Sequence, residues 1–140
     1  MIAERRLDNG AKVILDTVSC TDIVSIGFWY VNGSRDEAPG YYGSAHLLEH
    51  ILFKGTRNRT AFEIAADIER VGGILNAFTE KEVTCYYCIV PKKNISIAID
   101  VLADMFTAPL FPKDDFEREK QVIANEIASV EDSPEEYSYD

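Results

Sequence analysis

The chain has 140 residues and a mass of 15.7 kDa, and its composition, 46% hydrophobic and 27% charged, is that of a folded globular domain rather than a disordered chain. Its formal net charge of −10 argues against nucleic acid as a partner, and no segment is apolar for long enough to span a bilayer, so we expect no membrane partner either. The three cysteines and the absence of a recognisable secretion signal predict a cytoplasmic protein.

The predicted elements come as pairs of strands followed by pairs of helices. Runs of β-branched and aromatic residues predict the strands, and helical periodicity between Gly and Pro breakers predicts the helices. In chain order they are strands at 11–16 and 22–33, helices at 41–54 and 60–73, two short strands or one bent strand at 74–90, and helices at 94–107 and 113–131. This order predicts an α+β fold in which helices pack on one face of a mostly antiparallel sheet.

Both histidines of the chain lie in the predicted helix at 41–54. His46 and His50 are four residues apart, and Glu49 precedes the second. At about 100° per residue the three side chains share an arc of about 100°, whereas the leucines and the one isoleucine of the helix fall on the opposite face. Two imidazoles at this spacing suit zinc, and a third ligand has to come from another element. The alternative, two solvated surface histidines, explains neither their spacing nor the neighbouring carboxylate.

The last predicted helix, 113–131, carries two carboxylates on its apolar stripe. Glu119 and Glu126 are seven residues apart and share the face that is expected to point to the core. Buried carboxylates need a charged partner or a metal. One of them, together with His46 and His50, would give the three protein ligands and open position of a catalytic zinc site, and the other would support an imidazole. Helical periodicity leaves open which glutamate has which role.

The segment His46-Leu47-Leu48-Glu49-His50 matches the HxxEH motif of inverzincins. Its surroundings, GSAHLLEHILFKGT (43–56), resemble the signature of the pitrilysin family of zinc metallopeptidases, which includes insulin-degrading enzyme and mitochondrial processing peptidase. Further stretches that resemble the family are GSRDE (33–37), GG-x-x-NAFT (72–79) and EIASVEDSP (126–134). In that family a glutamate 76 positions after the second histidine is the third ligand. The resemblance therefore implies Glu126 as the ligand and Glu119 as the supporting carboxylate.

The resemblance also implies a reaction and its partners. It implies a zinc-dependent endopeptidase with one Zn²⁺ per chain, in which Glu49 is the general base. A peptide or unfolded protein segment would bind as an added strand beside Asn76 and Ala77, whose alternative is an ordinary place in a strand or turn. Because the resemblance covers roughly the first third of the family's proteins, we expect residues 1–140 to be an incomplete N-terminal zinc-binding domain. Its partners would be the missing C-terminal half and a second subunit, in a homodimer or a heterodimer.

Two other functions compete with this interpretation. A non-catalytic peptide-binding or assembly subunit of the same family is the main alternative, and the intact set of His46, Glu49, His50 and Glu126 argues against it. Another HxxEH enzyme, S-ribosylhomocysteine lyase, completes its site with a distant histidine that this chain does not contain. The pair Cys85 and Cys88 is not expected to form a metal or redox site, because residues three apart in a strand point to opposite faces.

Overall fold

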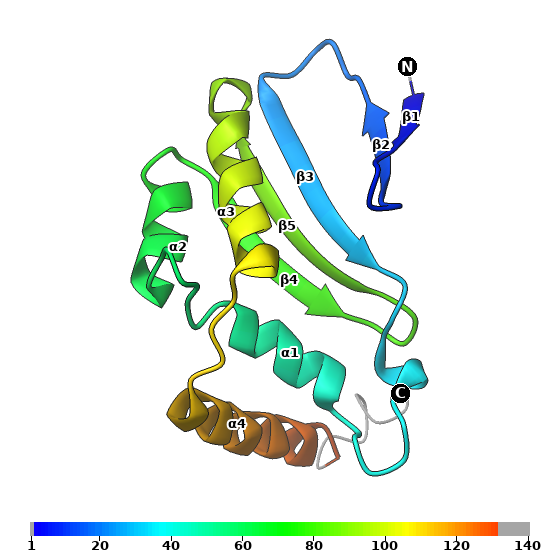
Figure 1. Cartoon of the computed structure of the whole chain (residues 1–140), viewed down its shortest axis with the longest axis vertical. Helices are drawn as coiled ribbons and strands as arrows, with labels where there is room; N and C mark the ends of the chain where they lie inside the picture. The colour runs from blue at the N-terminus through cyan, green and yellow to red at the C-terminus, as the bar shows by residue number, and fades with distance from the viewer. Residues whose placement is uncertain (1, 132–140) are drawn as a thin grey trace.

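The computed structural model describes residues 2–131 (Figure 1). The strands are β1 (Ile2–Arg6), β2 (Lys12–Asp16), β3 (Ile23–Tyr30), β4 (Ile74–Thr79) and β5 (Thr84–Pro91), and the α-helices are α1 (Ser44–Leu52), α2 (Ala61–Glu69), α3 (Ile95–Thr107) and α4 (Lys113–Glu131). Two short 3₁₀ helices, η1 (Ser34–Asp36) and η2 (Lys92–Asn94), precede the α1 region and α3.

The centre of the fold is a three-stranded antiparallel sheet in the order β3-β5-β4. Tyr86 in the middle strand stands opposite Phe28 of β3 and Ala77 of β4. Helix α3 packs on β5 and β3, and α1 and α2 pack on β4, so that the helices share one side of the sheet (Figure 1). The predicted α+β fold, with helices on one face of an antiparallel sheet, is confirmed.

The core lies between this face of the sheet and the helices α2 and α3. Alternation along β5 directs every second side chain into it, while α3 contributes a nearly continuous apolar stripe. Cys88 belongs to this core, whereas Cys85 packs on the other side of the sheet beside Gly27 and Trp29. Its buried members are Leu52, Ile64, Ile68, Tyr86, Cys88, Val90, Ala98, Val101, Leu102 and Met105.

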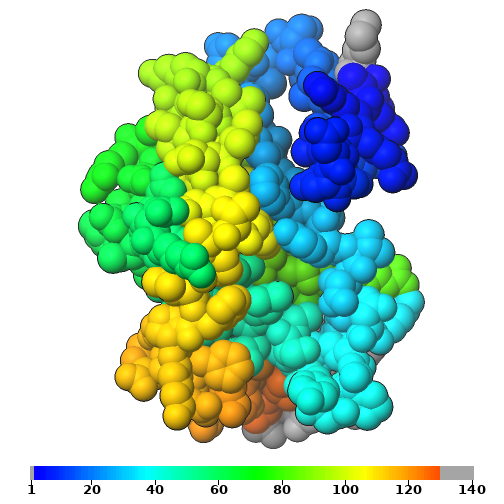
Figure 2. All heavy atoms as spheres, in the orientation of Figure 1, coloured from blue at the N-terminus to red at the C-terminus, as the bar shows by residue number. Residues whose placement is uncertain are grey.

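Two details of the strands differ from the prediction or go beyond it. Strand β1 was not predicted, because IAERR is mostly charged and becomes a strand only by pairing with β2 in a separate exposed hairpin (Figure 2). The segment 74–90 is resolved into two strands, since the backbone N–H of Glu80 donates to the carbonyl of Val83 and reverses the chain. Helix α2 opens with a capping box, in which Thr60 and Glu63 each accept the other's backbone N–H.

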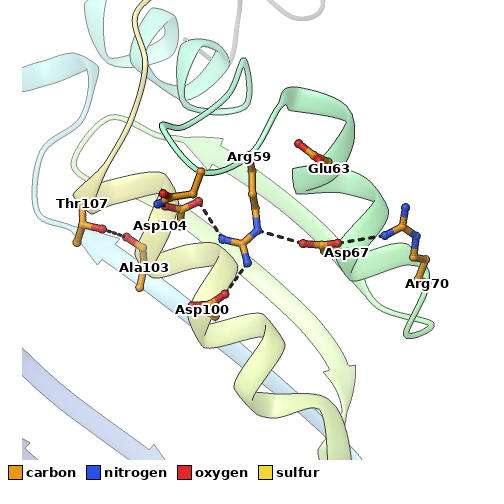
Figure 3. Close-up of a pocket in the computed structure, with 9 residues that line it drawn as sticks. Arg59, Glu63, Asp67, Arg70, Asp100, Ala103, Asp104 and Thr107 are labelled. Carbon is orange, nitrogen blue, oxygen red and sulfur yellow. Dashed lines mark hydrogen bonds and ion pairs between the residues drawn. The ribbon is translucent and has the colours of Figure 1, made fainter.

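The helices α2 and α3 are joined by a network of side-chain ion pairs around Arg59, beside an open polar pocket (Figure 3). The Arg59 guanidinium contacts Asp67 of α2 and both Asp100 and Asp104 of α3. Asp104 is buried and also accepts hydrogen bonds from the side chains of Thr56 and Asn58. Because these partners come from the loop between α1 and α2, the network fixes the end of α1 relative to the rest of the fold.

Replacement of Asp104 by asparagine is expected to lower the free energy of unfolding at pH 7 by about 1.5–3 kcal/mol, since a buried charged acceptor is lost. Burial alone would raise the pKa of Asp104, but its hydrogen bonds from Thr56, Asn58 and Arg59 hold that pKa below the ordinary value. A lowered pKa stabilises the fold at neutral pH and ceases to do so as the pH falls below about 4. Urea unfolding of parent and variant at pH 7 and pH 3 should therefore show a smaller difference at pH 3.

The control for this prediction is Asp100→Asn, which removes a more exposed carboxylate that pairs with the same arginine. It should lower the free energy of unfolding by less than half as much as Asp104→Asn. An equal loss for the two variants, or a loss from Asp104→Asn that does not change with pH, would show that the buried charge is not what stabilises this junction.

Within residues 2–131, no helix combines the length and the apolar character needed to cross a bilayer. The cytoplasmic location stays a prediction.

Candidate metal centre

The histidine helix α1 begins at a glycine and is capped by a residue from a preceding loop. Gly43 at the N-cap has a φ of +88°, a left-handed conformation that favours glycine. The carboxylate of Glu37 accepts the backbone N–H groups of Gly43 and Ala45, both at 2.7 Å. A carboxylate at this end of a helix also complements the positive pole of its dipole. Glu37 thereby fixes the first turn of the helix, which includes His46.

The loop that carries Glu37 is itself attached to the turn between β4 and β5. The N–H of Ser34 donates to the carbonyl of Glu80 and that of Arg35 to the carbonyl of Lys81. A side chain at Gly33 would collide with the backbone of this turn, so only glycine permits such a close approach. The Arg35 side chain also pairs with Glu82. The start of α1 and the end of β4 are therefore held by the same loop.

Three potential ligand atoms meet between α1 and α4, which lie side by side at one end of the molecule (Figure 1). Nitrogens of His46 and His50 and a carboxylate oxygen of Glu126 all lie within 4.8 Å of one another. Oε2 of Glu126 is 3.5 Å from Nε2 of His46 and 4.0 Å from Nε2 of His50. The two imidazole rings are perpendicular, with centroids 4.8 Å apart, so both can direct a nitrogen at one point.

This donor set fits a zinc ion. Zinc takes imidazole nitrogen and carboxylate oxygen at about 2.0–2.2 Å in a tetrahedron, which separates neighbouring ligand atoms by about 3.4 Å. The distances from Glu126 to the two imidazoles are within small side-chain rotations of that value. Three protein ligands also leave a fourth position of the tetrahedron open, as in catalytic rather than structural zinc sites.

Glu119 lies behind His50, on the side away from Glu126. Its Oε2 accepts a hydrogen bond of 2.9 Å from Nδ1–H of His50, and its Oε1 pairs with Lys54 at 2.7 Å. A proton held at Nδ1 leaves Nε2 of His50 free as a ligand atom. Burial by itself would raise the pKa of Glu119, but the contacts with Lys54 and His50 outweigh it and hold that pKa below its ordinary value.

The predicted burial of the two glutamates is right for one and wrong for the other. The Glu119 side chain is 8% exposed, as a core-facing carboxylate should be, whereas the Glu126 side chain is 48% exposed. Glu126 lies on the correct face of α4, but neighbouring apolar residues on that face, Val122 and Ile127, are also exposed in the described part of the chain. Helical periodicity predicted which face of α4 carries both glutamates, but it could not predict how much of that face other elements bury.

Glu49 is on the same turn as the histidines but is not part of the three-ligand group. Its Oε2 accepts a hydrogen bond of 2.5 Å from the Thr79 hydroxyl at the end of β4. Glu49 is therefore a carboxylate on the helix that carries both histidines, and it is not one of the three potential ligands.

Asn76 and Ala77 lie on β4, which has a partner strand on one side only in the described sheet. The side chain of Asn76 accepts the backbone N–H of Ala77 at 2.8 Å. The edge predicted to receive a substrate strand therefore exists, and a strand that pairs with Ala77 has to displace this hydrogen bond.

Cys85 and Cys88 lie on opposite faces of β5, and burial raises the pKa of the Cys88 thiol to about 11.

Three residues of the site were missed by sequence reasoning. Lys54 and Thr79 contact the carboxylates Glu119 and Glu49, and Glu37 caps α1. Each of them lies in a stretch noted for its resemblance, LFKGT, NAFT or GSRDE, but a carboxylate partner far away in sequence gave no local signal. The last residues of the EIASVEDSP stretch lie outside the described residues.

Comparisons with known proteins agree on one group. The sequence pattern of the family described as Insulinase (Peptidase family M16) matches residues 12–140. The uncharacterized zinc protease YmxG of Bacillus subtilis is 42% identical over 140 residues, 100% of this chain and 34% of the relative. A "probable mitochondrial-processing peptidase subunit beta, mitochondrial" of Arabidopsis thaliana is 39% identical over 134 residues, 96% of this chain and 25% of the relative.

A solved structure shows the same fold. The crystal structure of a protease from Helicobacter pylori matches with a TM-score of 0.90 and 31% identity, over 99% of this chain and 34% of that one. The chain thus spans between a quarter and a third of the length of these relatives. The family pattern, the relatives and the fold all lead to the same conclusion, that the chain belongs to the insulinase family, Peptidase family M16.

Proposed function

We propose that this chain is the N-terminal zinc-binding domain of a metalloendopeptidase that hydrolyses peptide bonds. The observation that carries the proposal is the meeting of His46 and His50 with Glu126, which follows His50 by 76 residues. Their ligand atoms come from two different helices and lie within 4.8 Å of one another. Two ligands on one turn could arise by chance on a helix, but a third from a distant helix at the same point argues for a site. The names of the relatives, zinc protease and processing peptidase, support the same chemistry.

The residues of the chain divide the chemistry between them. His46, His50 and Glu126 hold one zinc ion, which when bound supplies a Lewis acid that polarises a carbonyl and makes water more acidic. Glu49 takes a proton from the attacking water and returns it to the departing amine, so the carboxylate is restored in each cycle. Glu119 and Lys54 hold His50 in the tautomer and orientation that present its Nε2.

The substrate is a peptide or an unfolded protein segment that adds to the free edge of β4. An added strand exchanges backbone hydrogen bonds with this edge, so affinity depends little on side chains. Asn76 and Ala77 contact the substrate backbone in this arrangement. The relatives are three to four times as long as this chain, and a C-terminal portion of the full protein would close over the substrate. The chain alone is then expected to bind zinc but to cleave peptides poorly.

Metal removal tests this function. The full-length protein that contains this chain is expected to hold one zinc ion per site by elemental analysis and to cleave an unstructured peptide. Treatment with 1,10-phenanthroline should abolish cleavage, and added Zn²⁺ should restore it. The 140-residue chain should hold the same amount of zinc, and that zinc should be lost when His46 and His50 are both replaced by alanine. A protein that binds peptide but neither holds zinc nor cleaves would instead be a non-catalytic subunit.

A further inference from the structure

We infer that Thr79 is a positioning residue for Glu49, and that its hydroxyl holds the carboxylate where it can exchange a proton. The inference rests on the proposed function and adds a residue outside the HxxEH motif. The hydroxyl donates to Oε2 of Glu49 at 2.5 Å in a partly buried contact between the end of β4 and α1. A hydrogen bond to a charged acceptor is stronger than one between neutral groups, and partial burial shields it from competing water.

Thr79 is attached to a rigid part of the sheet. It is the last residue of β4 and stands opposite Thr84, the first residue of β5. The turn that joins them is closed by the N–H of Glu80 donating to the carbonyl of Val83 at 2.8 Å. A hydroxyl fixed by two neighbouring strands can set the position of a mobile side chain, because it has little freedom of its own.

Glu49 depends on this contact for its orientation. A glutamate side chain has three rotatable bonds, and fixing them costs conformational entropy. Within residues 2–131, the bond from Thr79 is the only hydrogen bond that its carboxylate makes. Oε2 is thereby held, and Oε1 keeps its lone pairs for the proton that arrives from water and leaves with the amine. Displacement of a catalytic group by about 1 Å can lower the rate by about 100-fold.

The competing interpretation is that Thr79 merely completes the strand. Its cross-strand partner Thr84 provides a matched control, because it is also a threonine on the same hairpin and its hydroxyl makes one hydrogen bond, but not to Glu49. Valine keeps the shape of threonine and removes the hydroxyl, whereas serine keeps the hydroxyl and removes a methyl group. The set Thr79→Val, Thr79→Ser and Thr84→Val therefore separates the hydrogen bond from the packing.

The kinetic test uses the zinc-loaded full-length protein and an unstructured peptide. Thr79→Val is expected to lower kcat by about 10- to 100-fold with KM changed by less than about threefold, since the defect lies in the chemical step. Thr79→Ser should recover most of the lost kcat, and Thr84→Val should keep kcat near that of the parent. An equal loss of kcat in both valine variants, or no recovery with serine, would make the role of Thr79 structural and overturn the inference.

A second test needs no activity. In urea unfolding of the 140-residue chain without metal, Thr79→Val should lower the midpoint in the parent but much less in a Glu49→Ala background, because the acceptor is already gone. Equal shifts in both backgrounds would overturn the inference whatever the kinetics show. If the parent protein cleaves no peptide, the proposed function fails by itself, and this coupling still decides whether Thr79 holds Glu49.

Discussion

Replacement of Glu49 by glutamine is expected to lower kcat for peptide cleavage by about 10²–10⁴-fold, while zinc remains bound. Glutamine has nearly the shape of glutamate and can still accept the Thr79 hydroxyl, but it cannot take a proton from water. Glu49 is outside the three-ligand group, so its loss should leave the zinc content of the protein unchanged. The measurement combines steady-state kinetics on one peptide with elemental analysis of the same samples.

A matched control for this variant is Glu69→Gln, on the exposed side of α2. It changes the net charge equally and should leave kcat within about twofold of the parent, as surface substitutions usually do little. Cleavage by Glu49→Gln at the parent rate would refute the general-base role. A loss of zinc together with activity would place Glu49 among the metal ligands instead.

Replacement of Glu126 by alanine is expected to weaken zinc binding more than the same change at Glu119. Removal of a supporting carboxylate lowers metal affinity by about 10- to 100-fold, and removal of a ligand should exceed that range. Glu126 is the carboxylate that faces Nε2 of both histidines, whereas Glu119 contacts one histidine, His50, and does so at Nδ1. Competition with a chromophoric zinc chelator, performed on the 140-residue chain, measures both affinities.

The two glutamates are expected to separate in a second measurement. Glu119 is buried against Lys54, so Glu119→Ala leaves a partly buried ammonium without its partner and should lower the urea midpoint. Glu126 is half exposed, and its loss should change the midpoint of the metal-free chain little. Glu117→Ala, at an exposed position of the same helix, serves as control. If Glu126→Ala kept its zinc while Glu119→Ala lost it, the ligand and the supporting residue would have to be exchanged.

The predictions from sequence succeeded where the determining interactions are local. His46 and His50 share one side of α1 because of helical geometry alone. For the same reason, the seven-residue spacing of Glu119 and Glu126 places both on the side of α4 that packs against α1. The assignment of Glu126 rather than Glu119 as the ligand came from family resemblance, since helical periodicity could not supply it, and it stays a prediction.

The missed features depend on the relative positions of distant segments. Glu37 can cap α1 only because the loop before it is attached to the turn between β4 and β5. Thr79 reaches Glu49 only because β4 ends beside α1, and β1 is a strand only because β2 pairs with it. Hydrogen bonds of this kind are determined by strand register and helix packing, which sequence patterns of 10–15 residues do not encode.

The separation of the ligands along the chain links metal supply to folding. His50 and Glu126 are 76 positions apart, so a metal held by both closes a loop that includes β4, β5 and α3. The unfolded chain does not bring these ligands together, and the free energy of binding therefore adds to the stability of the folded state. At a free zinc concentration 100 times the dissociation constant this amounts to about 2.7 kcal/mol. Cells starved of zinc would then lose the folded protein to proteolysis as well as its activity.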